Sequence, residues 1–146
     1  MLNKIILASK SDVRKKILKE NKIDCLIEPS NVDEDSVKVS LLKEKATPVI
    51  VSKNLAELKA NKVSQKFSGE IVLGADSIID LEGEIISKPK NRLEALKILE
   101  KLNGKTHQLI SSVCISRDGS MIWNYTDKAS LTMKQMSEEE LKLYLA

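Results

Sequence analysis

The sequence predicts one mixed α/β domain, a sheet flanked by helices. Short apolar runs alternate along the chain with segments of helical periodicity. Two long strand-like segments, residues 107–116 and 121–132, are joined by Asp118-Gly119, a typical hairpin turn. The 146 residues, of which 42% are hydrophobic and 31% charged, are enough to bury a single core without disulfide bonds or a metal ion.

The chain begins with a strand, a polar loop and a helix. Residues 4–8 form an apolar run with two isoleucines, which is typical of a buried strand. Ser11 is suited to cap a helix whose apolar face contains Val13, Ile17 and Leu18. A second strand is expected over residues 23–28.

The next part of the chain predicts a turn and two helices. Residues 30–35 form an acidic turn, and a helix follows at about 37–45. Thr47-Pro48 places a capping residue before a proline at the first helical position, which predicts a helix that runs to about Lys66.

The second half predicts a strand, a hairpin, a helix, the long hairpin and a last helix. The strand over residues 70–73 is expected to end at Gly74-Ala75-Asp76, and Gly83 lies in the turn of the short hairpin. Asn91 caps a helix that Gly104 ends, and Ser137 with Glu140 has the spacing of a capping box.

Composition argues against several classes of protein. The net charge of +3 and the aromatic content of 3% disfavour a nucleic-acid binder. Cys25 and Cys114 lack metal-ligand spacing, so we expect buried, reduced thiols. No run approaches the ~20 apolar residues of a membrane span, and the N-terminus turns polar too early for a secretory signal. We therefore expect a cytoplasmic protein that binds neither membranes nor nucleic acid.

The segment L-A-S-K-S-D-V-R at residues 7–14 is a candidate phosphate site. A strand that leads through Ser9 and Ser11 into a helix presents free backbone N–H groups at the positive end of the helix dipole. Lys10 and Arg14 can add charged contacts. An ordinary strand–helix turn with a serine cap explains the same residues.

Two further segments contain candidate functional residues. In G-A-D-S at 74–77, Asp76 at a strand tip can hold Mg²⁺ or orient a water, or it can be a turn aspartate. In S-K-P-K at 87–90, the following proline stiffens the backbone at Lys88, which suits a phosphate contact, although exposed loop lysines are common.

The acidic run V-D-E-D at 32–35 can supply a metal ligand or can simply be solvated. A backbone partner is expected to satisfy the lone His107. No dinucleotide or P-loop fingerprint is present. Together these segments favour a phosphoanhydride held by cations, with Mg²⁺ bridging it to carboxylates.

The order of these motifs resembles the Maf family of nucleoside triphosphate pyrophosphatases. The matching segments cover essentially the whole chain: L-A-S-K-S-D-V-R-K-K-I-L at 7–18, V-D-E at 32–34, L-A-E-L-K-A at 55–60, V-L-G-A-D-S at 72–77, S-K-P at 87–89, E-A-L-K-I-L-E-K-L-N-G-K-T-H at 94–107 and W-N-Y-T-D-K-A-S-L-T-M at 123–133.

The resemblance implies a two-lobed fold with a cleft, similar to that of inosine triphosphatases, and hydrolysis of a nucleoside triphosphate between the α and β phosphates with Mg²⁺ or Mn²⁺. It implies that Asp76 and Glu34 are catalytic residues and metal ligands, and that four residues bind the substrate: Ser9, Arg14, Lys59 and Lys88. It also implies a homodimer. The family's older description as a septum-formation inhibitor suggests an alternative, a non-catalytic nucleotide-binding or cell-division module.

The chain departs from the family pattern in three places. Ser11-Asp12-Val13-Arg14 replaces the usual S-P-R-R, so one phosphate cation is lost. Relatives without that arginine include the branch that acts on 7-methyl-GTP. G-A-D-S replaces G-A-D-T and keeps the hydroxyl group. Family members continue for roughly a quarter to a third of this length again, so residues 1–146 are expected to be a C-terminally truncated Maf-like domain with an exposed sheet edge or apolar patch.

Overall fold

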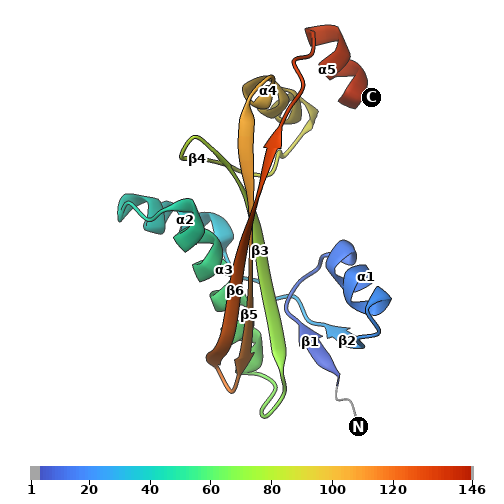
Figure 1. Cartoon of the computed structure of the whole chain (residues 1–146). Coiled ribbons are helices and arrows are strands. Elements are labelled where there is room, and N and C mark those ends of the chain that lie inside the picture. The colour runs from blue at the N-terminus through green and yellow to red at the C-terminus, as the bar shows by residue number, and fades with distance from the viewer. Residues whose placement is uncertain (1–3, 146) are drawn as a thin grey trace. The chain divides into compact units, whose positions relative to one another are not determined.

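The computed structural model describes residues 4–145 and contains both strands and helices along the whole of that range (Figure 1). One six-stranded sheet has the order β2 (Cys25–Ile27), β1 (Ile5–Leu7), β3 (Val72–Leu81), β5 (Thr106–Arg117) and β6 (Ser120–Thr132), and β4 (Glu84–Ile86) pairs with β3. The helices are α1 (Asp12–Glu20), α2 (Glu34–Lys43), α3 (Pro48–Ser64), α4 (Arg92–Leu102) and α5 (Glu138–Leu145). The predicted α/β class is confirmed.

The chain divides into two compact units. The first unit contains the described residues up to Ser77 together with Ser111–Asp127, and therefore β1, β2, α1, α2 and α3. The second unit contains Ile78–Ile110 and the described residues from Lys128 onward, and therefore β4, α4 and α5. Strands β3, β5 and β6 contribute residues to both units.

Within the first unit, β1 runs parallel to both of its neighbours. Ile5 is opposite Cys25 on β2, and Leu7 is opposite Leu73 on β3. The expectation that β3 ends at Gly74-Ala75-Asp76 is wrong, because the strand continues to Leu81. The reason is that β5 pairs with β3 on its other side and β4 pairs with its last residues. Asp76 therefore lies inside β3, beyond the point where β1 has ended.

Helix α3 packs very closely against β3. Its buried residues Ala56, Ala60 and Val63 form a core with Val72 and Ile6. A Cβ atom at Gly74 would lie 2.4 Å from the Ala56 carbonyl oxygen and 2.7 Å from the Ala60 nitrogen. Only glycine fits at this position, so the distance between α3 and β3 depends on Gly74.

Local capping signals define the helix starts as predicted. The side chains of Ser11, Thr47 and Asn91 accept hydrogen bonds from the backbone N–H three residues later. Ser137 and Glu140 form the expected reciprocal capping box at α5. In each case the partners are close neighbours in the chain, so the signal could be found in the sequence.

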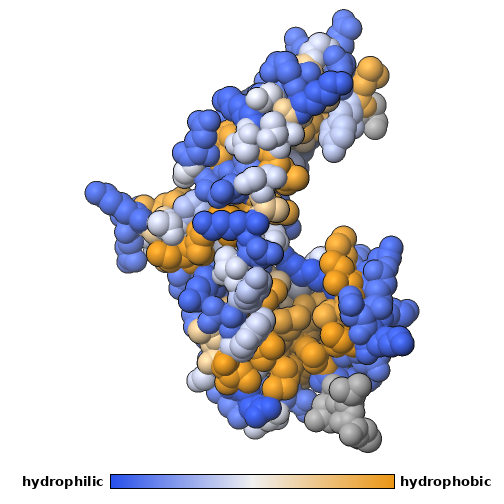
Figure 2. Space-filling model, in the orientation of Figure 1, coloured by the Kyte–Doolittle hydropathy of each residue, from blue (hydrophilic) through white to orange (hydrophobic). Residues whose placement is uncertain are grey.

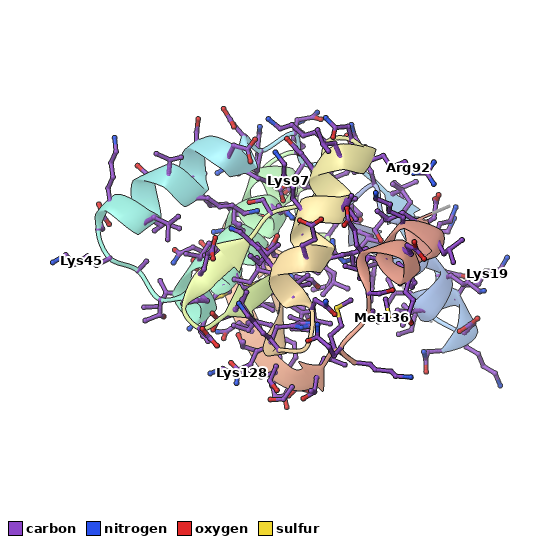
Figure 3. The ribbon with its side chains drawn as sticks, turned by 90° about the horizontal axis from the view of Figure 1, so that it is seen from above. Lys19, Lys45, Arg92, Lys97, Lys128 and Met136 are labelled. Atoms are coloured by element: carbon purple, nitrogen blue, oxygen red, sulfur yellow. The ribbon has the colours of Figure 1, made fainter. Side chains whose placement is uncertain are left out.

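The second unit is built around the short hairpin and the two helices α4 and α5. Leu81 is opposite Glu84 across a turn in which Glu82 and Gly83 have positive φ angles of 51° and 94°. Arg92, labelled in Figure 3, donates from Nη2 to the Leu145 carbonyl oxygen at 2.6 Å. This bond links the start of α4 to the end of α5.

Both cysteines are free thiols. Cys114 belongs to the core beneath α3, and burial raises the pKa of its thiol to about 11. Cys25 is half-buried on β2. The prediction of a buried thiol is confirmed for Cys114 and wrong for Cys25, because β2 is the last strand at one edge of the sheet.

The apolar face predicted for α1 is uncovered at two of its three residues, while Leu18 is half-buried. Val13 is 68% exposed and Ile17 is 52% exposed, and no residue of α1 is buried. Figure 2 shows hydrophobic side chains gathered on the first unit beside this helix. Among residues 4–145, no helix is long and apolar enough to cross a membrane.

Substituting Gly74→Ala is expected to destabilise the protein by about 1–3 kcal/mol, because the added methyl group forces α3 away from β3. Urea unfolding measures this change. Ser120→Ala, at an exposed position of β6, is the control and should cost less than about 0.5 kcal/mol. Equal stabilities of Gly74→Ala and the parent protein would show that α3 can shift at no cost.

Candidate functional site

Glu34 is the first residue of α2. The Asp33 carboxylate caps the helix by accepting hydrogen bonds from the Ser36 N–H at 3.2 Å and the Ser36 hydroxyl at 2.9 Å. These hydrogen bonds lower the pKa of Asp33. The prediction of an acidic turn over residues 30–35 is therefore wrong for its last two residues. Asp33 caps the helix, so α2 starts at Glu34 instead of near residue 37.

Lys59 lies at the centre of a group of oxygen atoms. It is only 8% exposed, and its ammonium group contacts the Glu34 carboxylate. It also donates to Asp76 Oδ1 at 3.2 Å and to the Ala75 carbonyl oxygen at 3.2 Å. A lysine ammonium has three N–H donors, so these three acceptors use all of them.

Asp76 is the most deeply buried member of this group. It is 5% exposed, and its Oδ2 atom has no hydrogen-bond partner among the described residues. Burial raises the pKa of Asp76, and the adjacent Lys59 charge opposes that effect in part. The Ser52 hydroxyl donates to the Asp76 backbone carbonyl at 3.3 Å and anchors the strand to α3 at this point.

The loop between β1 and α1 is held by hydroxyl groups. Ser9 Oγ accepts from Arg14 Nη1 and from the Ser11 N–H, each at 3.1 Å. Ser11 Oγ accepts from the Arg14 N–H at 3.2 Å. The predicted phosphate residues Ser9 and Arg14 thus contact each other at the start of α1.

The sheet register relates this loop to the carboxylates. Leu7 is opposite Leu73, and the Ala8 N–H donates to the Leu73 carbonyl at 2.9 Å. Ser9 therefore follows β1 at the level of Ala75 on the neighbouring strand, and adjacent strands are about 4.8 Å apart. The loop and the Glu34–Lys59–Asp76 cluster lie at the same end of the parallel strands, where α/β sheets bind ligands.

Lys88 belongs to the second unit. It is exposed, in the loop between β4 and α4. Its contact with phosphate stays a prediction. His107, also in the second unit, has a buried Nδ1 atom without a hydrogen-bond partner among the described residues, so the expected backbone partner is not found there at that atom.

The site could hold a cation through few protein ligands. Residues 4–145 contain no group of three or more His, Cys, Asp or Glu side chains able to hold a metal ion. Glu34 and Asp76 provide two carboxylates at one place, and Asp76 Oδ2 is an unsatisfied acceptor. Mg²⁺ is commonly bound by one or two carboxylates together with substrate phosphates, so these residues fit such an ion.

Sequence reasoning missed Lys38 and Ser52. Lys38 lies one turn after Glu34 on α2, and its charge lowers the pKa of Asp76. The spacing of four residues from Glu34 was the available signal, since such residues share a helix face. No local pattern marks Ser52, because its contact with Asp76 depends on how α3 packs.

Replacing Lys59 with Met is expected to lower stability by about 3–5 kcal/mol at pH 7, because it leaves a buried carboxylate unpaired. The loss should be smaller at pH 5. Without Lys59 the already raised pKa of Asp76 rises further, so the folded protein binds a proton more tightly than the unfolded chain does. The cost therefore grows as the pH rises from the ordinary pKa of an unfolded aspartate to the raised pKa in the folded protein, and it is complete above that value.

Urea unfolding at both pH values measures this effect. Lys53→Met, at an exposed position of α3, is the matched control and should cost less than about 0.5 kcal/mol. A loss of the same size at pH 5 and pH 7 would contradict the assignment to Asp76.

Comparison with known proteins identifies the family. The model of the Maf-like proteins matches residues 4–146. A nucleoside triphosphate pyrophosphatase of Pelagibacter ubique (strain HTCC1062) is 77% identical over 145 residues, which are 99% of this chain and 74% of that protein. A 7-methyl-GTP pyrophosphatase of Brucella abortus biovar 1 (strain 9-941) is 38% identical over 145 residues, 99% of this chain and 73% of that protein.

A solved HAM1 protein from Coxiella burnetii shares the fold. Its TM-score is 0.57 at 15% identity, and the match covers 88% of this chain and 71% of the other. The chain spans about three quarters of the length of the two pyrophosphatases that it matches. The match along nearly all of its residues shows that this chain belongs to the Maf family.

Proposed function

We propose that this chain is a nucleoside triphosphate pyrophosphatase that hydrolyses the α–β phosphoanhydride to a nucleoside monophosphate and pyrophosphate. The observation that carries the proposal is the buried Lys59–Asp76 pair, joined by the half-exposed Glu34, with an Asp76 Oδ2 atom that has no hydrogen-bond partner among residues 4–145. Buried polar atoms almost always have a hydrogen-bond partner, so an unsatisfied one calls for an explanation, and a bound ion is one such explanation. The name of the relative with 77% identity supports the same reaction.

The triphosphate is proposed to bind at the start of α1. The start of this helix of nine residues is the positive end of its dipole, and Ser9 and Arg14 provide a hydroxyl group and a cation there. Lys59 and Lys88 complete the proposed set of phosphate ligands. Lys88 precedes Pro89, which restricts its backbone and limits the entropy lost on binding.

Asp76 and Glu34 are proposed to hold a divalent cation, Mg²⁺ or Mn²⁺. The fit rests on two carboxylates at one point and on the free acceptor of Asp76. Such an ion, when bound, neutralises phosphate charge and makes a coordinated water more acidic.

The remaining chemistry belongs to the chain's own carboxylates. Asp76 is proposed to orient the attacking water and to accept its proton, and burial, which raises the pKa of Asp76, makes its carboxylate a stronger base. Glu34 is proposed to share the orientation of the water. The low exposure of Asp76 keeps bulk water away from that carboxylate.

The substrate includes modified nucleotides in this proposal. Val13 stands where the S-P-R-R pattern has an arginine, so the start of α1 has one cation fewer for phosphate. The Brucella relative is named a 7-methyl-GTP pyrophosphatase. The proposal also includes a homodimer, which the family resemblance supports, and a cytoplasmic location, which the polar N-terminus and the cysteine pattern support.

Product analysis tests the function. The purified chain is incubated with Mg²⁺ and, separately, dTTP, UTP, CTP and 7-methyl-GTP, and the phosphate products are quantified. We expect pyrophosphate and monophosphate, with one base preferred. Orthophosphate with diphosphate would overturn the α–β cleavage, and nucleotide binding without turnover would favour the non-catalytic module.

Asp76→Asn is expected to reduce turnover by at least about 100-fold, because the amide can neither accept the proton nor carry the charge that holds a cation. The initial rate of pyrophosphate release measures this change, with circular dichroism to confirm folding. Asp80→Asn, at the Gly83 turn of the same strand, is the control variant. Near-normal turnover by Asp76→Asn would remove Asp76 from the mechanism.

Lys88→Ala is expected to weaken triphosphate binding by about 1.5–3 kcal/mol if the contact is charge-assisted. The rise in KM, with little change in kcat, measures this loss. Lys90→Ala, two residues further along the same exposed loop, is the control. An unchanged KM for Lys88→Ala would show that Lys88 is an ordinary surface lysine.

A further inference from the structure

The ammonium group of Lys59 contacts the same kind of atoms that a divalent cation requires. Its three acceptors are two carboxylate oxygens, from Glu34 and Asp76, and the Ala75 carbonyl oxygen. Mg²⁺ and Mn²⁺ take carboxylate and carbonyl oxygens as ligands. In this structure the positively charged ammonium group of Lys59 contacts these oxygens.

Binding a second cation to the oxygens that Lys59 contacts is electrostatically unfavourable. Lys59 is 8% exposed and Asp76 is 5% exposed, so water screens their charges poorly. Repulsion between an ammonium and a divalent ion a few ångströms apart is strong in such surroundings. Binding of the ion therefore favours a state in which at least one carboxylate has left Lys59.

We propose that Lys59 is a positioning residue that takes the place of the divalent cation in the metal-free protein, and that Glu34 exchanges Lys59 for the ion when it binds. Glu34 is the partner that can move, because its side chain is 42% exposed and the residue is the first of helix α2. Asp76 lies within β3, and its backbone carbonyl is bonded to Ser52. The inference depends on the proposed function in one respect: it assumes that this site binds a divalent cation.

The exchange also resolves a conflict between the proposed role of Lys59 and its geometry. A lysine whose three N–H groups are all used has no donor left for a phosphate oxygen. When Glu34 leaves, one N–H of Lys59 becomes available. Lys59 can then contact the triphosphate only after the cation has bound, so the cation precedes the productive phosphate contact.

Binding of Mn²⁺ without any nucleotide tests the proposal. Free Mn²⁺ is measured by its electron paramagnetic resonance signal during titration of the parent protein and of Lys59→Met, with Lys53→Met as the control. Removing the competing charge is expected to tighten Mn²⁺ binding by at least about tenfold in Lys59→Met, with less than about a twofold change in Lys53→Met. Equal or weaker binding by Lys59→Met, or no binding by either protein, would overturn the proposal.

A second measurement uses the parent protein and does not depend on the folding of Lys59→Met. Nitrogen-15 spectra of labelled lysine side chains should contain a slowly exchanging ammonium signal from the buried Lys59, which Lys53→Met retains. Saturating Mg²⁺ is expected to shift this signal and to speed its proton exchange with water. An unchanged signal at Mg²⁺ saturation would overturn the proposal. Neither measurement includes a nucleotide, so failure of the proposed hydrolysis would be recognised separately, in the product analysis.

Discussion

The close approach of α3 to β3 at Gly74 is the constraint on which the candidate site depends. No Cβ atom fits between the strand and the backbone at Ala56 and Ala60. Lys59 lies between these two alanines in the sequence of α3, and Asp76 follows Gly74 by two residues on the strand. The packing of α3 against β3 therefore also brings the Lys59 ammonium group to the Asp76 carboxylate.

Burying the charged cluster is unfavourable to the free energy of folding. Burying an ammonium and a carboxylate costs free energy that their mutual attraction returns only in part, so such pairs are weak evidence for a role in stability. Here a third group, Glu34, adds a second negative charge to the same ammonium. Because two carboxylates face one ammonium group, Glu34 can exchange Lys59 for a cation while Asp76 keeps its ion pair, which agrees with the proposed function in binding a cation beside phosphates.

The departures from the sequence predictions have identifiable physical reasons. Glycine commonly interrupts strands, so G-A-D-S indicated a strand end; instead Gly74 marks a close helix contact inside a continuous strand. The acidic run indicated a turn, but Asp33 uses its carboxylate as a cap and Glu34 starts a helix. Val13 and Ile17 formed the expected stripe on α1, yet in the structure that stripe remains exposed.

The sequence by itself determined the α/β class, the helix starts at Ser11, Thr47, Asn91 and Ser137, and the hairpin turns, because each depends on neighbours in the chain. It also indicated Asp76 and the Ser9–Arg14 loop as chemical candidates, whereas Lys59 had the pattern of an exposed helix lysine and was singled out only by family resemblance. Only the tertiary structure decided that Glu34, Lys59 and Asp76 meet. These residues lie on three elements, and their contact depends on the distance between α3 and β3, a packing property that no local pattern encodes.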